Sequence, residues 1–151
     1  MATIAVFNQK GGVGKTTTTL NIAAVLAKAK RHPIALDMDP QGHLTLACGL
    51  KRDNGSNMTM AAFFEQQVPL AKLLRDTPAG WQIIASSLEL SKIDALYGGD
   101  PNVATLLKRG LKEELALTGA PILIDCCPML SVLTLNALIA ADRVLIPVSA
   151  D

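Results

Sequence analysis

The sequence lacks the features that mark secreted, disulfide-bonded and membrane-spanning proteins. Its three cysteines, Cys48, Cys126 and Cys127, fit neither a disulfide framework nor the ligand spacing of a zinc site. No stretch reaches the roughly 18 uninterrupted apolar residues of a transmembrane helix. The first apolar run meets Lys10 without the small-residue cleavage site of a signal peptide. These absences predict a protein of the reducing cytoplasm with no stable membrane insertion.

The sequence also lacks a large charge of either sign. The formal net charge at pH 7 is +1 and 18% of the residues are charged, so the composition gives no overall basic bias towards nucleic acid. Half of the 151 residues are hydrophobic and the mean hydropathy is +0.33. Such an apolar composition suits one domain built on a sheet that is covered on both faces, because the buried strands are then continuous apolar runs.

Short apolar runs alternate with helical segments along the chain. The alternation predicts an α/β fold with a mostly parallel sheet, right-handed crossovers and helices on both faces. No repeat or linker interrupts the pattern, so we expect one P-loop-type domain over residues 1–151. Strands are expected within residues 2–7, 33–42, 81–87, 121–128 and 143–149, and helices at residues 15–29, 58–76 (in short segments), 88–96, 102–117 and 132–141, with a polar surface loop at residues 51–57.

The last apolar run, residues 143–149, has the composition of a central strand. A strand that is buried on both faces needs a covering helix, and only Ala150 and Asp151 follow this one. We therefore expect the chain to be the front part of a longer protein, incomplete at its carboxyl end.

The stretch NQKGGVGKTT (residues 8–17) joins the first predicted strand to the first predicted helix. Its three glycines let the backbone turn through positive φ and approach a polyphosphate closely. The loop N–H groups and the amino end of the helix then offer hydrogen-bond donors and a positive dipole. Lys15 can reach the β and γ phosphates, and the Thr16 hydroxyl can ligate Mg²⁺. The sequence therefore predicts a site for ATP and Mg²⁺.

This loop departs from the usual G-x-x-x-x-G-K-[ST] spacing, because Gln9 stands at the first glycine position and a second lysine, Lys10, follows it. In this it resembles the deviant Walker A motif of the ParA/MinD class of P-loop ATPases. The resemblance implies that two subunits face each other across two ATPs and that Lys10 contacts phosphate across the dimer interface, as an arginine finger does. Lys10 and Lys15 are therefore expected to be catalytic. The residues expected to bind nucleotide are Lys10, Gly11, Gly12, Val13, Gly14, Lys15, Thr16 and Thr17.

A second segment, LDMDPQGHLT (residues 36–45), is similar to the first switch of the partition ATPases. The similarity implies that Asp39 orients the attacking water and is catalytic. His43 stands where the family usually has Asn. Near the end of the first helix the chain also has Lys30 where the family usually has glycine.

A third segment, ILIDCCP (residues 122–128), is similar to the Walker B and second-switch segment of the same family. The similarity implies that Asp125 holds Mg²⁺ through a water, beside Thr16. Cys127 replaces the usual Pro or Ala. Because Cys126 and Cys127 have no further Cys or His at ligand spacing, we interpret the pair as small core-filling side chains. The glycine loop, DMDPQ in the second segment and DCCP in the third lie at the carboxyl ends of predicted strands, where ligands bind in parallel sheets.

The resemblance covers most of the chain and matches the amino-terminal part of a ParA-type ATPase. It implies an ATP-dependent homodimer that hydrolyses ATP slowly alone and faster with a ParB-like partner. It also implies non-specific DNA binding, a nucleoid-associated cytoplasmic location, and a role in positioning a plasmid, a chromosome or another large cargo.

Other functions stay open at this point. A MinD-like membrane switch needs a carboxyl-terminal amphipathic helix that this sequence does not contain. An iron-protein reductase needs two cysteines from each subunit around a shared cluster, which adjacent cysteines can hardly supply. An ATP-dependent synthetase lacks a substrate-binding signature here. A nucleotide-binding fragment without turnover is the remaining alternative.

Overall fold

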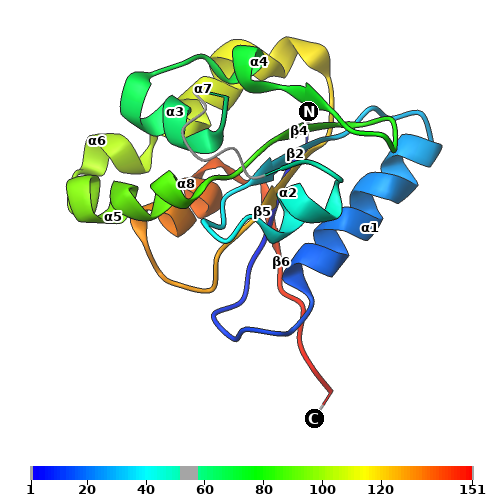
Figure 1. Cartoon of the computed structure of the whole chain (residues 1–151), viewed down its shortest axis with the longest axis horizontal. Helices are drawn as coiled ribbons and strands as arrows, with labels where there is room; N and C mark the ends of the chain where they lie inside the picture. Colours follow the sequence, from blue (N-terminus) through cyan, green and yellow to red (C-terminus); the bar gives the residue numbers. More distant parts are fainter. Residues whose placement is uncertain (1, 52–57, 151) are drawn as a thin grey trace.

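The computed structural model describes residues 2–51 and 58–150, which form one six-stranded sheet with helices packed on both faces (Figure 1). The strand order is β3-β4-β2-β5-β1-β6, and every neighbouring pair is parallel except β3 with β4. The predicted α/β class is thus confirmed. The strands are β1 (Thr3–Val6), β2 (Ile34–Asp37), β3 (Arg75–Asp76), β4 (Gln82–Ile84), β5 (Ile122–Asp125) and β6 (Arg143–Leu145).

Side chains of the central strands alternate between two cores. In β2, Ile34 and Leu36 belong to the larger core, and Ala35 between them belongs to the smaller one. The smaller core is covered by α1 and α2, and the larger core by α3 to α8. The helices are α1 (Lys15–Lys28), α2 (His43–Ala47), α3 (Met60–Gln66), α4 (Leu70–Leu73), α5 (Ser91–Tyr97), α6 (Pro101–Ala104), α7 (Leu106–Gly110) and α8 (Val132–Ala140).

The single amphipathic helix predicted over residues 102–117 is wrong as a continuous element. It is divided into α6, α7, a π-helical turn (Leu111–Leu115) and a 3₁₀ turn (Ala116–Thr118). The break has a local cause, because the backbone N–H of Leu107 donates to Asn136 Oδ1 of α8 (3.0 Å) and not to its own helix. The predicted apolar face is nevertheless buried, at Val103, Leu107, Leu111 and Leu115.

The prediction that residues 143–149 form a central strand is also wrong for the described chain. β6 is three residues long and pairs only with β1, at the edge of the sheet. Pro147 has no N–H with which to extend the ladder. The side chains of Val144 and Ile146 are 44% and 60% exposed, so this edge is apolar and accessible in the chain as it stands.

Two elements were not predicted from the sequence, the short antiparallel strand β3 and the helix α2 that follows the first switch. Of the predicted surface loop at residues 51–57, positions 52–57 lie outside the described residues. Over the described ranges, no helix combines the length and the apolarity needed to cross a membrane.

Helix α1 ends in a Schellman motif with a lysine at the position that favours glycine. The N–H of Arg31 bonds to the carbonyl of Leu26, and the N–H of Lys30 bonds to the carbonyl of Ala27 (both 2.9 Å). Lys30 has φ +57°, in the left-handed region that costs a residue with a Cβ atom about 1 kcal/mol or more. Lys30, which stands where the family usually has glycine, is therefore a strained residue at the end of α1.

We expect Lys30→Gly to raise the free energy of unfolding by about 0.5–1 kcal/mol, because glycine adopts positive φ without the Cβ penalty. Urea denaturation measures the change. The matched control is Lys28→Gly, which places glycine inside the last turn of α1 and is expected to destabilise by about 1 kcal/mol. Equal destabilisation by both substitutions would contradict the assignment of strain to Lys30.

Candidate nucleotide site

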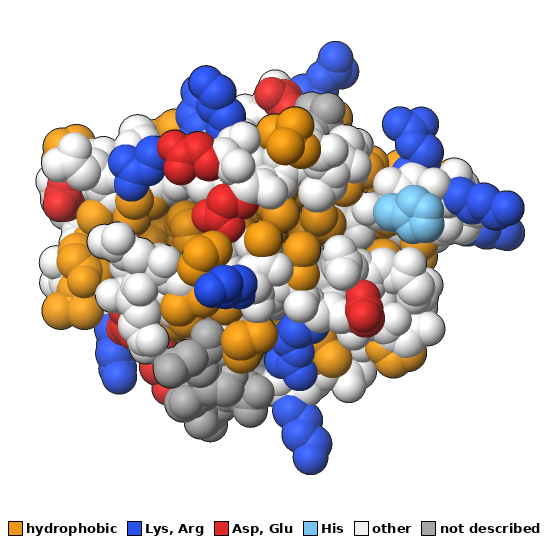
Figure 2. All heavy atoms as spheres, turned by 90° about the horizontal axis from the view of Figure 1, so that it is seen from above, with side chains coloured by type: hydrophobic (Ala, Val, Ile, Leu, Met, Phe, Trp, Pro, Cys, Tyr) orange, Lys and Arg blue, Asp and Glu red, His pale blue; other side chains and the backbone are white. Residues whose placement is uncertain are grey.

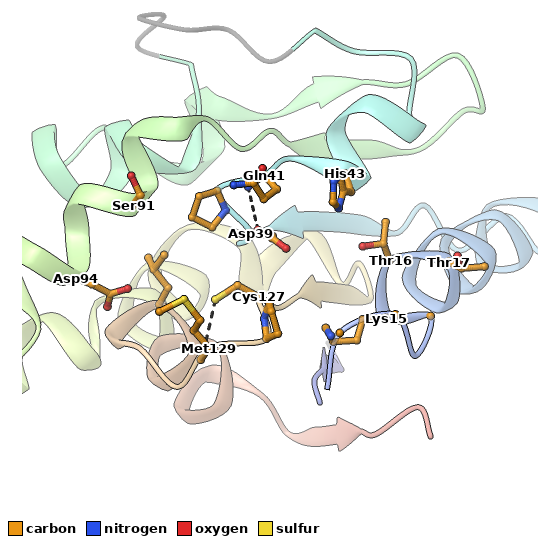
Figure 3. A pocket seen from close by; sticks show the side chains of 16 residues that line it. Lys15, Thr16, Thr17, Asp39, Gln41, His43, Ser91, Asp94, Cys127 and Met129 are labelled. Carbon is orange, nitrogen blue, oxygen red and sulfur yellow. Dashed lines mark hydrogen bonds between the residues drawn. The ribbon is translucent and has the colours of Figure 1, made fainter. Parts of the chain in front are cut away.

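Most of the predicted site residues line one cavity along the carboxyl ends of β1, β2 and β5 (Figure 3), and Asp125 is bonded to one of them, Thr16. The cavity has a volume of about 670 Å³. Its lining comes from the phosphate loop, the loop after β2, helix α5 and the loop after β5. The lining residues are Gly11, Gly12, Gly14, Lys15, Thr16, Thr17, Asp39, Pro40, Gln41, His43, Ser91, Asp94, Cys127, Pro128, Met129 and Leu133.

The phosphate loop has the backbone that a polyphosphate requires. Gly12 and Gly14 have φ +70° and +87°, and no atom lies within 4 Å of where a Cβ would stand. The loop ends at the amino terminus of α1, which begins with Lys15. Lys15 is 8% exposed, and its ammonium donates to the carbonyl of Lys10 (3.0 Å). This geometry can present loop N–H groups, the helix dipole and one cation to phosphate oxygens.

Thr16 and Asp125 lie together at the floor of the site. The Thr16 hydroxyl donates to Asp125 Oδ2 (2.7 Å), and the Thr19 hydroxyl lies 3.3 Å from Asp125 Oδ1. Burial raises the pKa of Asp125 to about 6, against the lowering effect of the bond from Thr16. A hydroxyl beside a carboxylate fits Mg²⁺, which takes one or two protein oxygens and completes its shell with phosphates and water. In the described residues no group of three His, Cys, Asp or Glu side chains could hold a metal by itself.

Asp37 and Asp39, at the start of the first switch, which we define as residues 38–42, have different environments. Asp37, just before it, is fully buried and accepts bonds from the Thr45 hydroxyl (2.6 Å) and backbone N–H (2.8 Å). Burial raises the pKa of Asp37 to about 7, the Thr45 bonds lower it, and the neighbouring charge of Asp125 raises it. Asp39 lines the cavity and accepts the N–H of Gln41 (2.9 Å). Asp37 therefore anchors α2, whereas Asp39 is placed to act on a ligand.

Lys10 lies apart from the cavity wall. It is exposed, its N–H donates to Asn8 Oδ1 (2.9 Å), and its ammonium donates to the Ser149 hydroxyl (3.1 Å). Asn8 also donates to the carbonyl of Pro147 (2.8 Å), so the start of the loop is tied to the segment after β6. Val13, also predicted to bind nucleotide, is absent from the cavity lining, whereas Thr17 is part of it. The roles assigned to the individual site residues remain predictions.

The adjacent cysteines differ from each other. Cys126 is packed in the larger core, and burial raises the pKa of its thiol, as expected of a core-filling residue. Cys127 lies in the second switch, defined as residues 126–131, and lines the cavity, with its sulfur 3.5 Å from the Thr134 hydroxyl.

Sequence reasoning missed the residues that close the far end of the cavity. Ser91 and Asp94 come from α5, and Met129 and Leu133 come from the segment after β5 (Figure 3). No motif marks them, since they reach the site only through the tertiary packing of α5 against α8. Asp94 points towards the cavity between Ser91 and Met129.

A parallel sheet with a glycine-rich loop between β1 and α1, Lys-Thr at the helix start and an aspartate at the end of a neighbouring strand defines a P-loop nucleotide-binding protein. The family model AAA_31, described as an AAA domain, matches residues 1–151, and the chain belongs to this family. Within it the chain is of the ParA type, which confirms the resemblance noted in the sequence.

Among curated proteins, the chain is 40% identical to a chromosome partitioning protein ParA of Myxococcus xanthus over 98% of its own length and 52% of the relative's. It is 38% identical to a chromosome-partitioning ATPase Soj of Thermus thermophilus, covering 98% of the chain and 55% of the relative. The chain thus spans about half of the length of these relatives.

Among solved structures, it is similar to a cobyrinic acid a,c-diamide synthase of Mycobacterium smegmatis with a bound ATP analogue and magnesium. The TM-score is 0.91 and the identity 34%, over 98% of this chain and 60% of that one. It is also similar to a plasmid partition protein of Borrelia burgdorferi bound to AMPPNP, with a TM-score of 0.82 and 26% identity over 99% and 63% of the two chains.

The raised pKa of Asp37 predicts that the metal-free protein loses stability as the pH rises. An acid whose pKa is 3.8 when unfolded and about 7 when folded stabilises the fold fully below pH 3.8, and this contribution is lost as the pH rises through about 7. We expect a decrease in unfolding free energy of the order of a few kcal/mol between pH 4 and pH 8. Urea denaturation in EDTA measures it.

Asp37→Asn should flatten this dependence and leave the smaller part that comes from Asp125. The exposed Asp76 serves as the control, since the unfolding free energy of Asp76→Asn should have the same pH dependence as that of the parent protein. An identical pH dependence in Asp37→Asn and the parent would contradict the assignment.

Proposed function

We propose that the chain is the nucleotide-binding part of an ATP-dependent dimerising switch of the ParA type, which binds and hydrolyses ATP with Mg²⁺. One observation carries the proposal: Lys15, the Thr16–Asp125 pair and Asp39, from three separate segments, border or underlie a single cavity at the strand ends. The ATP analogue and magnesium of the similar Mycobacterium smegmatis structure support the choice of ligand.

Each of these residues has a separate role in the proposed reaction. The loop N–H groups and Lys15 bind the β and γ phosphates, and Thr16 and Asp125 hold Mg²⁺, with Asp125 acting through a water. Magnesium bound there would neutralise the charge on the β and γ phosphates. Asp39 orients the attacking water from the first switch. Because both switches line the same cavity, loss of the γ phosphate changes the contacts of both at once.

Lys10 is proposed to act in the dimer. In the single chain its ammonium bonds to Ser149, and it does not line the cavity. Reaching a phosphate of the partner subunit requires that this exposed contact with a neutral hydroxyl be exchanged for a bond between two charged groups, which is the stronger of the two. Dimerisation then depends on ATP.

The partners and the cellular location that we propose for this protein are based on its similarity to the relatives. The two curated relatives are a chromosome partitioning protein and a chromosome-partitioning ATPase. We propose the same process for this protein, with a ParB-like stimulator, non-specific DNA and a nucleoid-associated cytoplasmic location. On the face drawn in Figure 2, Lys and Arg side chains lie mostly around the rim and form no continuous patch. A DNA contact on this face would therefore be weak, and the assignment rests on the relatives.

A synthetase is a second candidate because of the similar diamide synthase structure. An enzyme that activates a carboxylate substrate with ATP needs a cation near the γ phosphate to hold that carboxylate. At the far end of the cavity the polar groups are Ser91 and the carboxylate of Asp94, and Lys15 is the one Lys or Arg among the described lining residues. This charge distribution disfavours an anionic second substrate.

The dimer is tested by light-scattering molar mass on a sizing column with Mg-ATP and with Mg-ADP. We expect a dimer with Mg-ATP and a monomer with Mg-ADP. We expect Lys10→Ala to bind ATP with unchanged affinity and stay monomeric, because in its own subunit the Lys10 ammonium bonds to Ser149 and does not line the cavity. Lys15→Ala should not bind nucleotide, and the exposed Lys108 provides a neutral control as Lys108→Ala. A Lys10→Ala protein that dimerises normally would overturn the role of Lys10.

Asp39→Ala is expected to bind ATP and to lose turnover by about 100-fold or more, since the substitution removes the group that orients the attacking water. The ATP-bound dimer should then persist for hours on the same column, while the parent returns to monomer. Phosphate release measures the turnover. Turnover within a factor of two of the parent would show that Asp39 is not the residue that acts on the water.

A further inference from the structure

Residues 85–94, which run from the end of β4 into the first half of α5, carry none of the nucleotide motifs but bond to the first switch and to Val132, the residue that follows the second switch. We call them the bridging segment. At its start, the buried Ser86 donates its hydroxyl to the carbonyl of Asp39 in the first switch. The Ser86 N–H donates to the Thr45 hydroxyl (2.9 Å), which in turn donates to Asp37. The position of the first switch is therefore set partly from outside the switch.

At the other end of the bridging segment, Asp94 holds the second switch. Its Oδ1 accepts the backbone N–H of Val132 (2.7 Å), the first residue of α8. A carboxylate at a helix amino terminus makes a charge-assisted bond and also interacts favourably with the helix dipole. Asp94 lines the cavity as well, opposite Met129 (Figure 3).

The second switch is bound tightly to the same end of α8. The Thr134 hydroxyl donates to the carbonyl of Met129 (2.6 Å), and the Ser131 hydroxyl accepts the N–H of Thr134 (3.4 Å). Cys127 also contacts Thr134. A shift at Val132 therefore moves residues 127–131 together.

The bridging segment is held firmly between its two ends. The side chains of Leu90 and Ile93 are fully buried in the larger core, and the Ser91 hydroxyl donates to the carbonyl of Leu88 (2.7 Å). Ser87 contacts the Thr59 hydroxyl (3.2 Å). A segment packed in this way is expected to shift as a unit and not to deform smoothly, so that movement at one end would reach the other.

We propose that the bridging segment couples the two switches and that Ser86 and Asp94 are positioning residues for hydrolysis. Ser86 fixes the backbone of Asp39, and Asp94 fixes the second switch on the opposite side of the cavity. The role in hydrolysis rests on the proposed function, whereas the contacts that carry the coupling are made by the chain alone, without nucleotide. A partner that moves α5 would thereby act on both switches at once.

The test compares Asp94→Ala with Asp100→Ala. Asp100 is a matched control, because it also caps a short helix with its carboxylate, accepting the N–H of Asn102 (2.8 Å), but it does not line the cavity. We expect Asp94→Ala to lower kcat by about tenfold to a hundredfold, the range for one bond to a charged group, with nucleotide affinity within about threefold of the parent because the phosphate loop is untouched. Asp94→Asn keeps an acceptor oxygen and should restore most of the kcat.

A double-substitution cycle tests the coupling. If one segment positions both switches, Ser86→Ala and Asp94→Ala should be strongly non-additive in kcat. Additive effects, or equal kcat in Asp94→Ala and Asp100→Ala, would overturn the proposal while leaving the ATPase assignment intact.

Amide hydrogen exchange on the nucleotide-free protein tests the coupling even if the protein has no measurable ATPase activity. Asp94→Ala should accelerate exchange at Val132 by about tenfold or more, and it should also accelerate exchange at residues 41–45, at the end of the first switch and the start of α2. Asp100→Ala should change neither. Faster exchange at Val132 alone would show a helix cap without coupling and would overturn the inference. A parent protein that does not bind ATP would count against the proposed function only.

Discussion

Two carboxylates that are buried side by side form the constraint on which the site depends. Asp37 and Asp125 stand at the same register on the neighbouring strands β2 and β5, with exposures of 0% and 1%. Burying charges is costly unless they are hydrogen-bonded, so each carboxylate needs donors. Thr45 supplies them to Asp37, and Thr16 and Thr19 supply them to Asp125. These threonines belong to α2 and α1, so the bonds that satisfy the carboxylates also fix both helices at the strand ends.

The sequence predicted those parts of the molecule whose structure is determined by a few neighbouring residues. The strand–loop–helix unit around Lys15 could be predicted because a few adjacent residues determine the turn, the helix start and the charge. Convergence of the three motif segments could be predicted too, since parallel strands place their carboxyl ends on one edge of the sheet. The sequence also showed that Lys30 stands where the family usually has glycine, but only the structure showed that its backbone is in the left-handed conformation.

The features that escaped prediction depend on pairs of residues distant in sequence. Asn136 captures the N–H of Leu107 and divides a helix whose amphipathic pattern is continuous. Asp94 closes the cavity because α5 packs on α8, and neither segment carries a signature for that contact. The position of β6 at an edge is likewise a property of the assembled sheet, whereas its apolar composition alone favours a central strand.

The hydrogen bonds of the site also bear on how a nucleotide can act as a switch. Lys15 bonds to the carbonyl of Lys10, Lys10 bonds to Ser149, and Thr16 bonds to Asp125. A ligand that enters the cavity must replace the internal bonds of Lys15 and Thr16, so its net gain at each of these groups is smaller than the new bond alone. A ligand shifts a conformational equilibrium only by its differential affinity for the two states. Under the proposed function, a diphosphate would satisfy the loop in either state, so the free energy for rearranging the switches and releasing Lys10 would come from contacts that only the third phosphate makes.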